Sequence, residues 1–158
     1  MVEVGPARVW LLDTRQYRSE QVCDRLPDLP ASELCGGALD PNRTMLGAAQ
    51  EEWLADGVDP TDGRWDIVAQ QVVMADLSVE FGNDVGVNND QWDGYPAARE
   101  RLLKLLTDHD RSLVLSGDLH AAMENTVTDS DELPSCAELV VPSVTSLMNL
   151  TTAAGLTL

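Results

Sequence analysis

An aspartate and a histidine stand two residues apart in the segment SGDLH, and this pair is suited to metal chemistry. Asp118 and His120 follow the apolar run Leu113–Leu115. If the backbone here is extended, the period of two in a strand places both side chains on one face, where a carboxylate and an imidazole can share a metal ion. An imidazole suits iron or zinc, and a carboxylate also suits hard cations. The alternative is that Asp118 caps a helix and His120 lies on the surface.

A second group of oxygen donors lies in the polar segment Asn88–Tyr95. Asn88, Asp90 and the main-chain carbonyl of Trp92 alternate along it. Calcium accepts about six to eight oxygen ligands with flexible geometry, so a loop of this kind can wrap around the ion. The segment lacks the spacing and the terminal glutamate of an EF-hand loop. The alternative is an Asn- and Asp-rich turn that binds no ion.

Two arginines follow the first apolar run of the chain, in the segment DTRQYR. Arg15 and Arg18 could hold a phosphate group through bidentate hydrogen bonds, with Asp13 orienting an arginine. The alternative is that they are exposed arginines without a specific partner.

No motif of a serine or cysteine nucleophile accompanies these residues. The sequence contains no GxSxG, P-loop or GxGxxG pattern. The other histidine, His109, stands at the end of a predicted helix, where capping or interaction with the helix dipole is a sufficient explanation.

Alternating strand and helix patterns must position these side chains. Apolar runs predict strands, and apolar residues at spacings of three and four predict helices. Gly57 is a stop signal for the first helix, and Pro96 suits the first turn of the second. The predicted strands are Val9–Leu12, Ile67–Met74 and Leu113–Leu115, and the predicted helices are Met45–Gly57 and Pro96–His109. Long loops are expected at Cys23–Pro41 and Gly82–Gly94. This order predicts an α/β domain with functional loops at the strand ends.

Composition narrows the classes of function. The chain has 158 residues, 44% of them hydrophobic, so it can form one domain or a piece of one. Its formal net charge of -17 would repel a nucleic-acid backbone, which argues against DNA or RNA as a partner. No apolar run approaches the roughly 18 residues that a membrane span needs.

Cysteine usage and the first residues bear on the cellular compartment. Cys23 and Cys35 lie in a Pro- and Gly-rich segment that a disulfide could close in an exported protein, and a free pair is the alternative. Cys136 is expected to be a small buried hydrophobe. The first residues do not have the pattern of a signal peptide. The protein therefore stays inside the cell, or its true beginning lies upstream.

Several segments of the chain together resemble the PhoD-like alkaline phosphatases. They occur in the order and approximate spacing of that family and extend over nearly the whole chain. These segments are DTRQYR, RTMLGAAQEEWL, WDIVAQQVVMADL, WDGYPAARERLL, LVLSGDLHAA and LVVPSVTS.

The resemblance implies a partial metallophosphatase domain over residues 1–158, part of a four-layer α/β/β/α sandwich. It implies hydrolysis of phosphomonoesters and phosphodiesters at a centre of iron and calcium. Asn88, Asp90 and Trp92 correspond to the calcium loop of the family, and Asp118 and His120 to its metal-centre motif. With Arg15, the last two are the candidate catalytic residues. The full-length parent would be periplasmic or secreted.

The sequence also departs from the family pattern. An Asp-rich strand-end motif, an iron-binding Cys and Tyr, and a histidine-containing stretch near the end have no counterpart. We therefore expect a chain that lacks part of the metal site. The alternative is a noncatalytic, acidic calcium-binding remnant or subunit-like domain.

Overall fold

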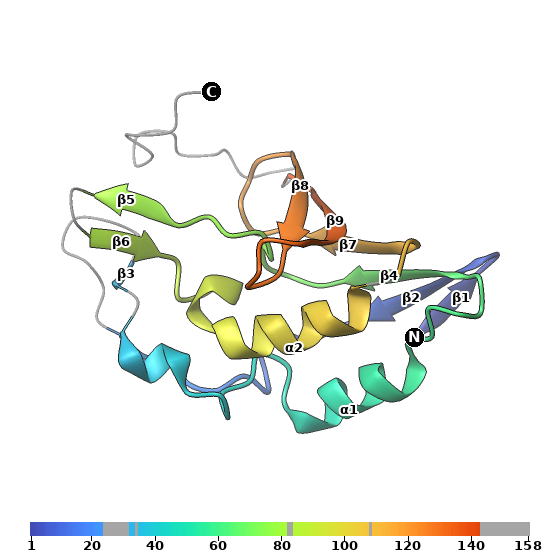
Figure 1. Cartoon of the computed structure of the whole chain (residues 1–158), viewed down its shortest axis with the longest axis horizontal. Coiled ribbons are helices and arrows are strands. Elements are labelled where there is room, and N and C mark those ends of the chain that lie inside the picture. The colour runs from blue at the N-terminus through green and yellow to red at the C-terminus, as the bar shows by residue number, and fades with distance from the viewer. Residues whose placement is uncertain (24–31, 34, 82–83, 108, 143–158) are drawn as a thin grey trace.

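The structure is a computed structural model that describes residues 1–23, 32–33, 35–81, 84–107 and 109–142. A six-stranded sheet with the order β1-β2-β4-β7-β9-β8 dominates it (Figure 1). Strands β2, β4, β7 and β9 are mutually parallel, and β1 and β8 close the two edges in antiparallel pairs. The strands are β1 (Val2–Val4), β2 (Ala7–Leu11), β4 (Trp65–Ala69), β7 (Ser112–Ser116), β8 (Met123–Thr128) and β9 (Pro134–Val140).

A smaller antiparallel sheet lies beyond the ends of the parallel strands. Its order is β3-β6-β5, formed by Ser32–Glu33, Asp84–Val87 and Val79–Phe81. It lies at the left of Figure 1, on the side toward which the arrowhead of β4 points.

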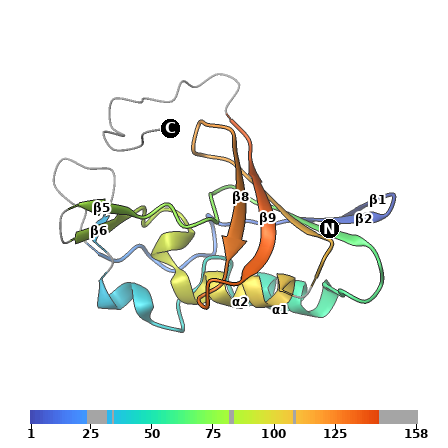
Figure 2. The ribbon, with the colours of Figure 1, turned by 45° about the horizontal axis from the view of Figure 1, so that its top comes forward.

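Two α-helices, α1 (Ala48–Gly57) and α2 (Pro96–Leu106), lie together on one side of the large sheet (Figure 2). Two short 3-10 helices precede them in the chain, η1 (Gly36–Leu39) before α1 and η2 (Trp92–Gly94) before α2. Pro96 occupies the first turn of α2, where its missing N–H is not needed.

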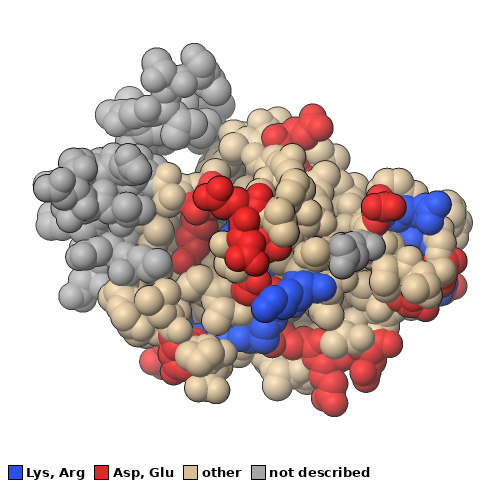
Figure 3. All heavy atoms as spheres, viewed as in Figure 1, with Lys and Arg blue, Asp and Glu red and all other residues tan. Residues whose placement is uncertain are grey.

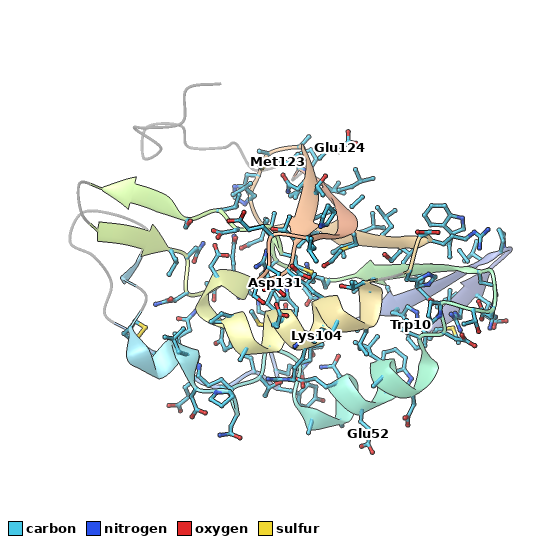
Figure 4. The ribbon with its side chains drawn as sticks, viewed as in Figure 1. Trp10, Glu52, Lys104, Met123, Glu124 and Asp131 are labelled. Carbon is cyan, nitrogen blue, oxygen red and sulfur yellow. A yellow bond between two sulfur atoms is a disulfide. The ribbon has the colours of Figure 1, made fainter. Side chains whose placement is uncertain are left out.

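The core lies between this helical layer and one face of the sheet. Trp10 of β2 lies beside the end of α1 (Figure 4) and makes an edge-to-face contact with Trp53, whose ring centroid is 4.9 Å away. The close approach requires a glycine at position 57, because a Cβ there would lie 2.3 Å from the Trp10 ring.

The opposite face of the sheet is also apolar. Two rows of side chains cross it in register, Val9–Ile67–Leu113–Ala137 and Leu11–Ala69–Leu115–Leu139. Leu11 remains 60% exposed and Leu139 39%. Because both described α-helices cover the other face, the described part of the chain leaves this one open, as one sheet of a sandwich would.

The predicted α/β fold class is confirmed, with corrections at the element boundaries. The first helix begins at Ala48 rather than Met45 because Gly47 has a φ of +77°, which is not helical. The strand predicted for Ile67–Met74 ends at Ala69, because the Gln70 side chain bonds to the backbone of Val72 and closes a turn.

Two predicted loops contain regular structure. Gly82–Gly94 includes β6 and η2, and the described part of Cys23–Pro41 includes β3 and η1. Cys23 and Cys35 form a disulfide, and Cys136 is free and buried, as expected.

Within the described residues, no helix is long and apolar enough to cross a membrane. Acidic side chains occur at several places across the face seen in Figure 3, in keeping with the negative net charge.

Candidate functional site

The candidate residues gather beyond the carboxyl ends of the parallel strands. Backbone hydrogen bonds hold the first residues after the strands together: Leu12 N–H donates to Ala69 O, and Gln70 N–H donates to Leu115 O. Loops that follow neighbouring parallel strands meet at this edge, which is where α/β sheets bind their ligands.

The loop after β2 is a turn built on Asp13. Its Oδ1 accepts hydrogen bonds from the backbone N–H groups of Gln16 (2.9 Å) and Arg15 (2.8 Å), which lower the pKa of this carboxyl. Thr14 is buried and donates both its N–H and its hydroxyl to Gln71 Oε1. Asp13 therefore shapes the backbone of the turn that carries Arg15, and its orienting of an arginine side chain stays a prediction.

Arg15 links two of the predicted metal ligands. Its Nη1 lies 2.6 Å from Asp90 Oδ2, and its Nη2 lies 3.7 Å from Asp118 Oδ2. The two aspartates are separated by 28 positions in the sequence and come from different loops. The structure thus brings Arg15, Asp90 and Asp118 together.

Asp90 has further partners. Arg18 Nη2 lies 2.8 Å from Oδ1, and Gln21 Nε2 donates to the same oxygen at 2.7 Å. Partial burial raises the pKa of Asp90, but the hydrogen bonds from Arg15 and Arg18 lower it more, so the net pKa is below its ordinary value. Asp90 is therefore an anion at neutral pH.

The Asn88–Tyr95 segment is a closed, well-bonded loop. Asn88 Oδ1 accepts the N–H of Asp90 at 3.0 Å, and Trp92 O accepts the N–H of Tyr95 at 2.9 Å. Gly94 is required, because a Cβ at this position would lie 2.5 Å from Asn89 O.

The donor set of this loop fits calcium in part. Asn89 Oδ1 is buried and has no hydrogen-bond partner among the described residues, so one amide oxygen of the loop is left unsatisfied. The carbonyl of Trp92 has a second lone pair. Carboxylate, amide and carbonyl oxygens are the donors that calcium prefers, but the ion needs about six to eight of them. The described residues contain no group of three or more His, Cys, Asp or Glu that could hold a metal.

Asp118 and His120 are not extended, which corrects the expected strand geometry. Their φ angles are +72° and +60°, in the left-handed region, so the period of two does not apply to them. Non-glycine residues adopt this conformation rarely, and such residues cluster at functional sites. Both side chains are exposed at the strand end, and Asp118 faces Arg15.

His109 is at the other end of the sheet and is not a simple helix cap. It is buried, and its Nε2 lies 2.8 Å from Asp66 Oδ2. Asp66 also accepts hydrogen bonds from Arg8 and Trp10.

The sequence did not predict a polar cluster that lies between the candidate site and the core. It comprises Gln70, Ser116, Asn125 and Glu138. A charged residue in the apolar run of β9 was a signal that could have indicated it.

A hollow of about 320 Å³ lies between α1 and α2, outside the candidate site. Apolar residues such as Leu54 and Leu102 line most of it, on the helical side of the molecule. It contains none of the predicted metal or catalytic residues.

Comparison with known proteins relates this arrangement to a family. A family model described as PhoD-like phosphatase matches residues 1–155. Alkaline phosphatase D of Bacillus subtilis (strain 168) is 34% identical over 142 residues, which are 86% of this chain and 24% of that protein. A solved structure described as that of PhoD matches with a TM-score of 0.75 and 31% identity, over 87% of this chain and 27% of that one. The chain spans about a quarter of the length of these relatives.

Proposed function

Because the chain belongs to the PhoD-like phosphatase family, we propose that it supplies one part of a metal-dependent phosphoesterase site. The reaction is the hydrolysis of phosphomonoesters or phosphodiesters by a metal-activated water. The whole chain, residues 1–158, is then part of one metallophosphatase domain.

One observation carries the proposal: Arg15 lies between Asp90 and Asp118, within 2.6 Å and 3.7 Å. Two carboxylates that converge on one cationic group at the carboxyl ends of parallel strands are placed to hold cations and an anionic substrate together.

Each side chain then has a role. Asp90, Asn88 and the carbonyl of Trp92 hold calcium, and the unsatisfied Asn89 Oδ1 supports an oxygen-donor site here. Asp118 and His120 contribute to the iron-containing centre, because an imidazole suits iron. Bound cations of this kind polarise the phosphoryl group and lower the pKa of a bound water.

Arg15 acts on the substrate. Its guanidinium forms an ion pair with Asp90. If Asp90 and Asp118 held cations, the planar guanidinium of Arg15 would be available to donate two parallel hydrogen bonds to phosphoryl oxygens.

The remaining ligands come from residues outside the described part of the chain. The described residues provide too few donors for calcium and iron together. The open apolar face, with Leu11 and Leu139 exposed, provides a surface on which a second sheet of the same domain packs. The Cys23–Cys35 disulfide is in keeping with a periplasmic or secreted parent protein.

A second candidate is a noncatalytic, acidic calcium-binding domain. The incomplete set of metal ligands among the described residues favours it. Such a domain would gain thermal stability from calcium and would not hydrolyse phosphoesters.

The test is complementation. The chain alone and the chain fused to the amino-terminal half of a PhoD-like phosphatase are assayed with calcium and ferric iron on aryl phosphate monoesters and diesters. We expect near-background turnover alone and activity in the fusion. Asp90→Asn or His120→Ala in the active fusion should reduce kcat/KM about a hundredfold, or about 2.7 kcal/mol.

Asp110→Asn is the matched control, because Asp110 is exposed beside the amino end of β7. It should leave kcat/KM unchanged. An inactive fusion that calcium nevertheless stabilises would favour the noncatalytic domain. Full activity of the isolated chain, or unchanged turnover and metal content in both site variants, would contradict the proposal.

A further inference from the structure

Glu138 is a buried carboxylate in the middle of the sheet. It lies in a row of side chains that faces the helices, Trp10–Val68–Val114–Glu138–Asn125, in which the three members before it are apolar. Its exposed fraction is 0%. No Lys, Arg or His of the described residues lies within ion-pair distance of it. Burial penalises an uncompensated charge, so a carboxylate at this place needs hydrogen-bond donors.

Four donors supply those hydrogen bonds, and they come from three different parts of the chain. Oε1 accepts the N–H of Met74 at 2.7 Å and the hydroxyl of Ser116 at 2.5 Å. Oε2 accepts the N–H of Ala75 at 2.9 Å and the amide of Asn125 at 3.1 Å. Glu138 thus joins β7, β8 and the segment that follows β4.

The cluster continues from Ser116 toward the calcium loop. Ser116 Oγ accepts the amide N–H of Gln70 at 2.6 Å, and Gln70 Oε1 accepts the indole N–H of Trp92 at 3.2 Å. The backbone N–H of Val72 also donates to this Oε1, which fixes the orientation of the Gln70 amide. The indole of Trp92 is fully buried.

The two ends of this chain of hydrogen bonds lie next to the two predicted metal loops. Ser116 precedes Asp118 by two residues, and Trp92 follows Asp90 by two. Hydrogen bonds behind metal ligands orient those ligands, and their removal typically lowers metal affinity. A displacement of Glu138 would therefore be transmitted to both loops.

We propose that Glu138 is a positioning residue that sets the placement of the Asp90 loop relative to the Asp118 loop, through Ser116, Gln70 and Trp92. The proposal rests on the function proposed above. Glu138 touches no substrate or metal and acts only through the residues that it holds.

The test uses Glu138→Gln in the full chain, with Asp66→Asn as the matched control. Asp66 is equally buried and equally hydrogen-bonded, but its side-chain partners are Arg8, Trp10 and His109, none of which belongs to either predicted metal loop. Glutamine keeps the size of the side chain but turns an NH₂ group toward donors that need an acceptor. Ser116→Ala is a second variant. It removes the hydroxyl group that links Glu138 to Gln70 and introduces no new polar group.

Heteronuclear NMR spectra give a readout that a loss of stability alone does not change. In Glu138→Gln and Ser116→Ala we expect shifts of the Trp92 indole N–H resonance and of the Asp90 and Asp118 amides. Asp66→Asn should leave these three unchanged. Shifts confined to the direct neighbours Met74, Ala75 and Asn125 would overturn the proposal.

Calorimetric titration with calcium alone adds a functional measure. Glu138→Gln should weaken calcium binding at least about tenfold, whereas Asp66→Asn should bind like the parent chain. Equal affinities in the two variants would also overturn the positioning role. If the parent chain binds no calcium, the proposed calcium site is wrong, and the three resonances still decide the role of Glu138.

Discussion

At the amino end of the parallel strands Asp66 is buried against Arg8 and His109, whereas toward the carboxyl end Glu138 is buried with neutral donors only. Arg8 Nη2 lies 2.5 Å from Asp66 Oδ2, and His109 Nε2 lies 2.8 Å from the same oxygen. Beyond Glu138, the arginines Arg15 and Arg18 lie in the exposed loops and pair with Asp90.

The difference indicates that the two ends serve different purposes. A buried charge with a paired, hydrogen-bonded partner is compensated and has no need of a ligand. Carboxylates that gather without buried counter-charges, next to residues with left-handed backbone, are typical of sites that bind something. This contrast is the basis for proposing that the amino end serves stability and the carboxyl end serves function.

The largest effect is expected at the amino end. Asp66→Ala removes the buried carboxylate of β4 and leaves the buried guanidinium of Arg8 without this partner. The free energy of unfolding should therefore fall by about 3–5 kcal/mol. Urea unfolding followed by tryptophan fluorescence measures this loss. Asp62→Ala is the control, because Asp62 also pairs with Arg8, at 3.1 Å, but is partly exposed. Similar losses in both variants would show that Asp66 is not the principal partner.

A second effect, which arises from a buried carboxyl group rather than from an ion pair, is expected near Glu138. Burial, with repulsion from Asp76, raises the pKa of Asp93 to about 7 from its ordinary value of 3.8. Between these two values the folded protein binds more protons than the unfolded chain. The contribution of Asp93 to stability is therefore fully present below about pH 4 and is lost as the pH rises to about 7, by at most about 1.4 kcal/mol per pH unit.

Unfolding of the chelator-treated protein at a series of pH values tests this dependence. Asp93→Asn should flatten the slope in that window, because it removes the group that titrates. Asp110→Asn, exposed at the other end, should preserve the slope. A slope that persists in Asp93→Asn would assign the titration to another residue.

The smallest effect concerns Arg15. This arginine and a bound cation compete for the carboxylate of Asp90, so Arg15→Ala should strengthen calcium binding. The pair is partly exposed, so the gain should not exceed about fivefold. Calorimetry measures it, with Arg64→Ala as the control, since Arg64 pairs with Glu3 and Asp62 at the amino end. Weaker calcium binding in Arg15→Ala would contradict the competition.

Sequence patterns predicted the elements but not their ends. The apolar run Leu113–Leu115 lies within β7, and the helix of Pro96 begins where expected. The first helix and the strand of Ile67–Met74 were too long, because the φ of Gly47 and the hydrogen bonds of the Gln70 side chain depend on local backbone geometry that apolar spacing does not report.

The sequence predicted which residues belong to the candidate site, but it did not predict how they are arranged in space. Arg15, Asp90 and Asp118 were each selected from sequence, but their convergence depends on the order of β2, β4 and β7 in the large sheet and on where the loop after β6 lies. His109 was assigned to a helix end because its partner Asp66 lies 43 positions away in the chain.

By itself, the sequence determined the α/β class, the acidic surface and the family, because apolar period, charge and motif order are local or additive properties. The tertiary structure alone decided which carboxylates are compensated. Asp66 and Glu138 are both acidic residues within apolar strands, and the residues next to them in the sequence do not show which one is paired with a cation. Arg8 and His109 reach the first, and Ser116 and Asn125 reach the second. Only the packing of distant strands places a cation beside one carboxylate and neutral donors beside the other.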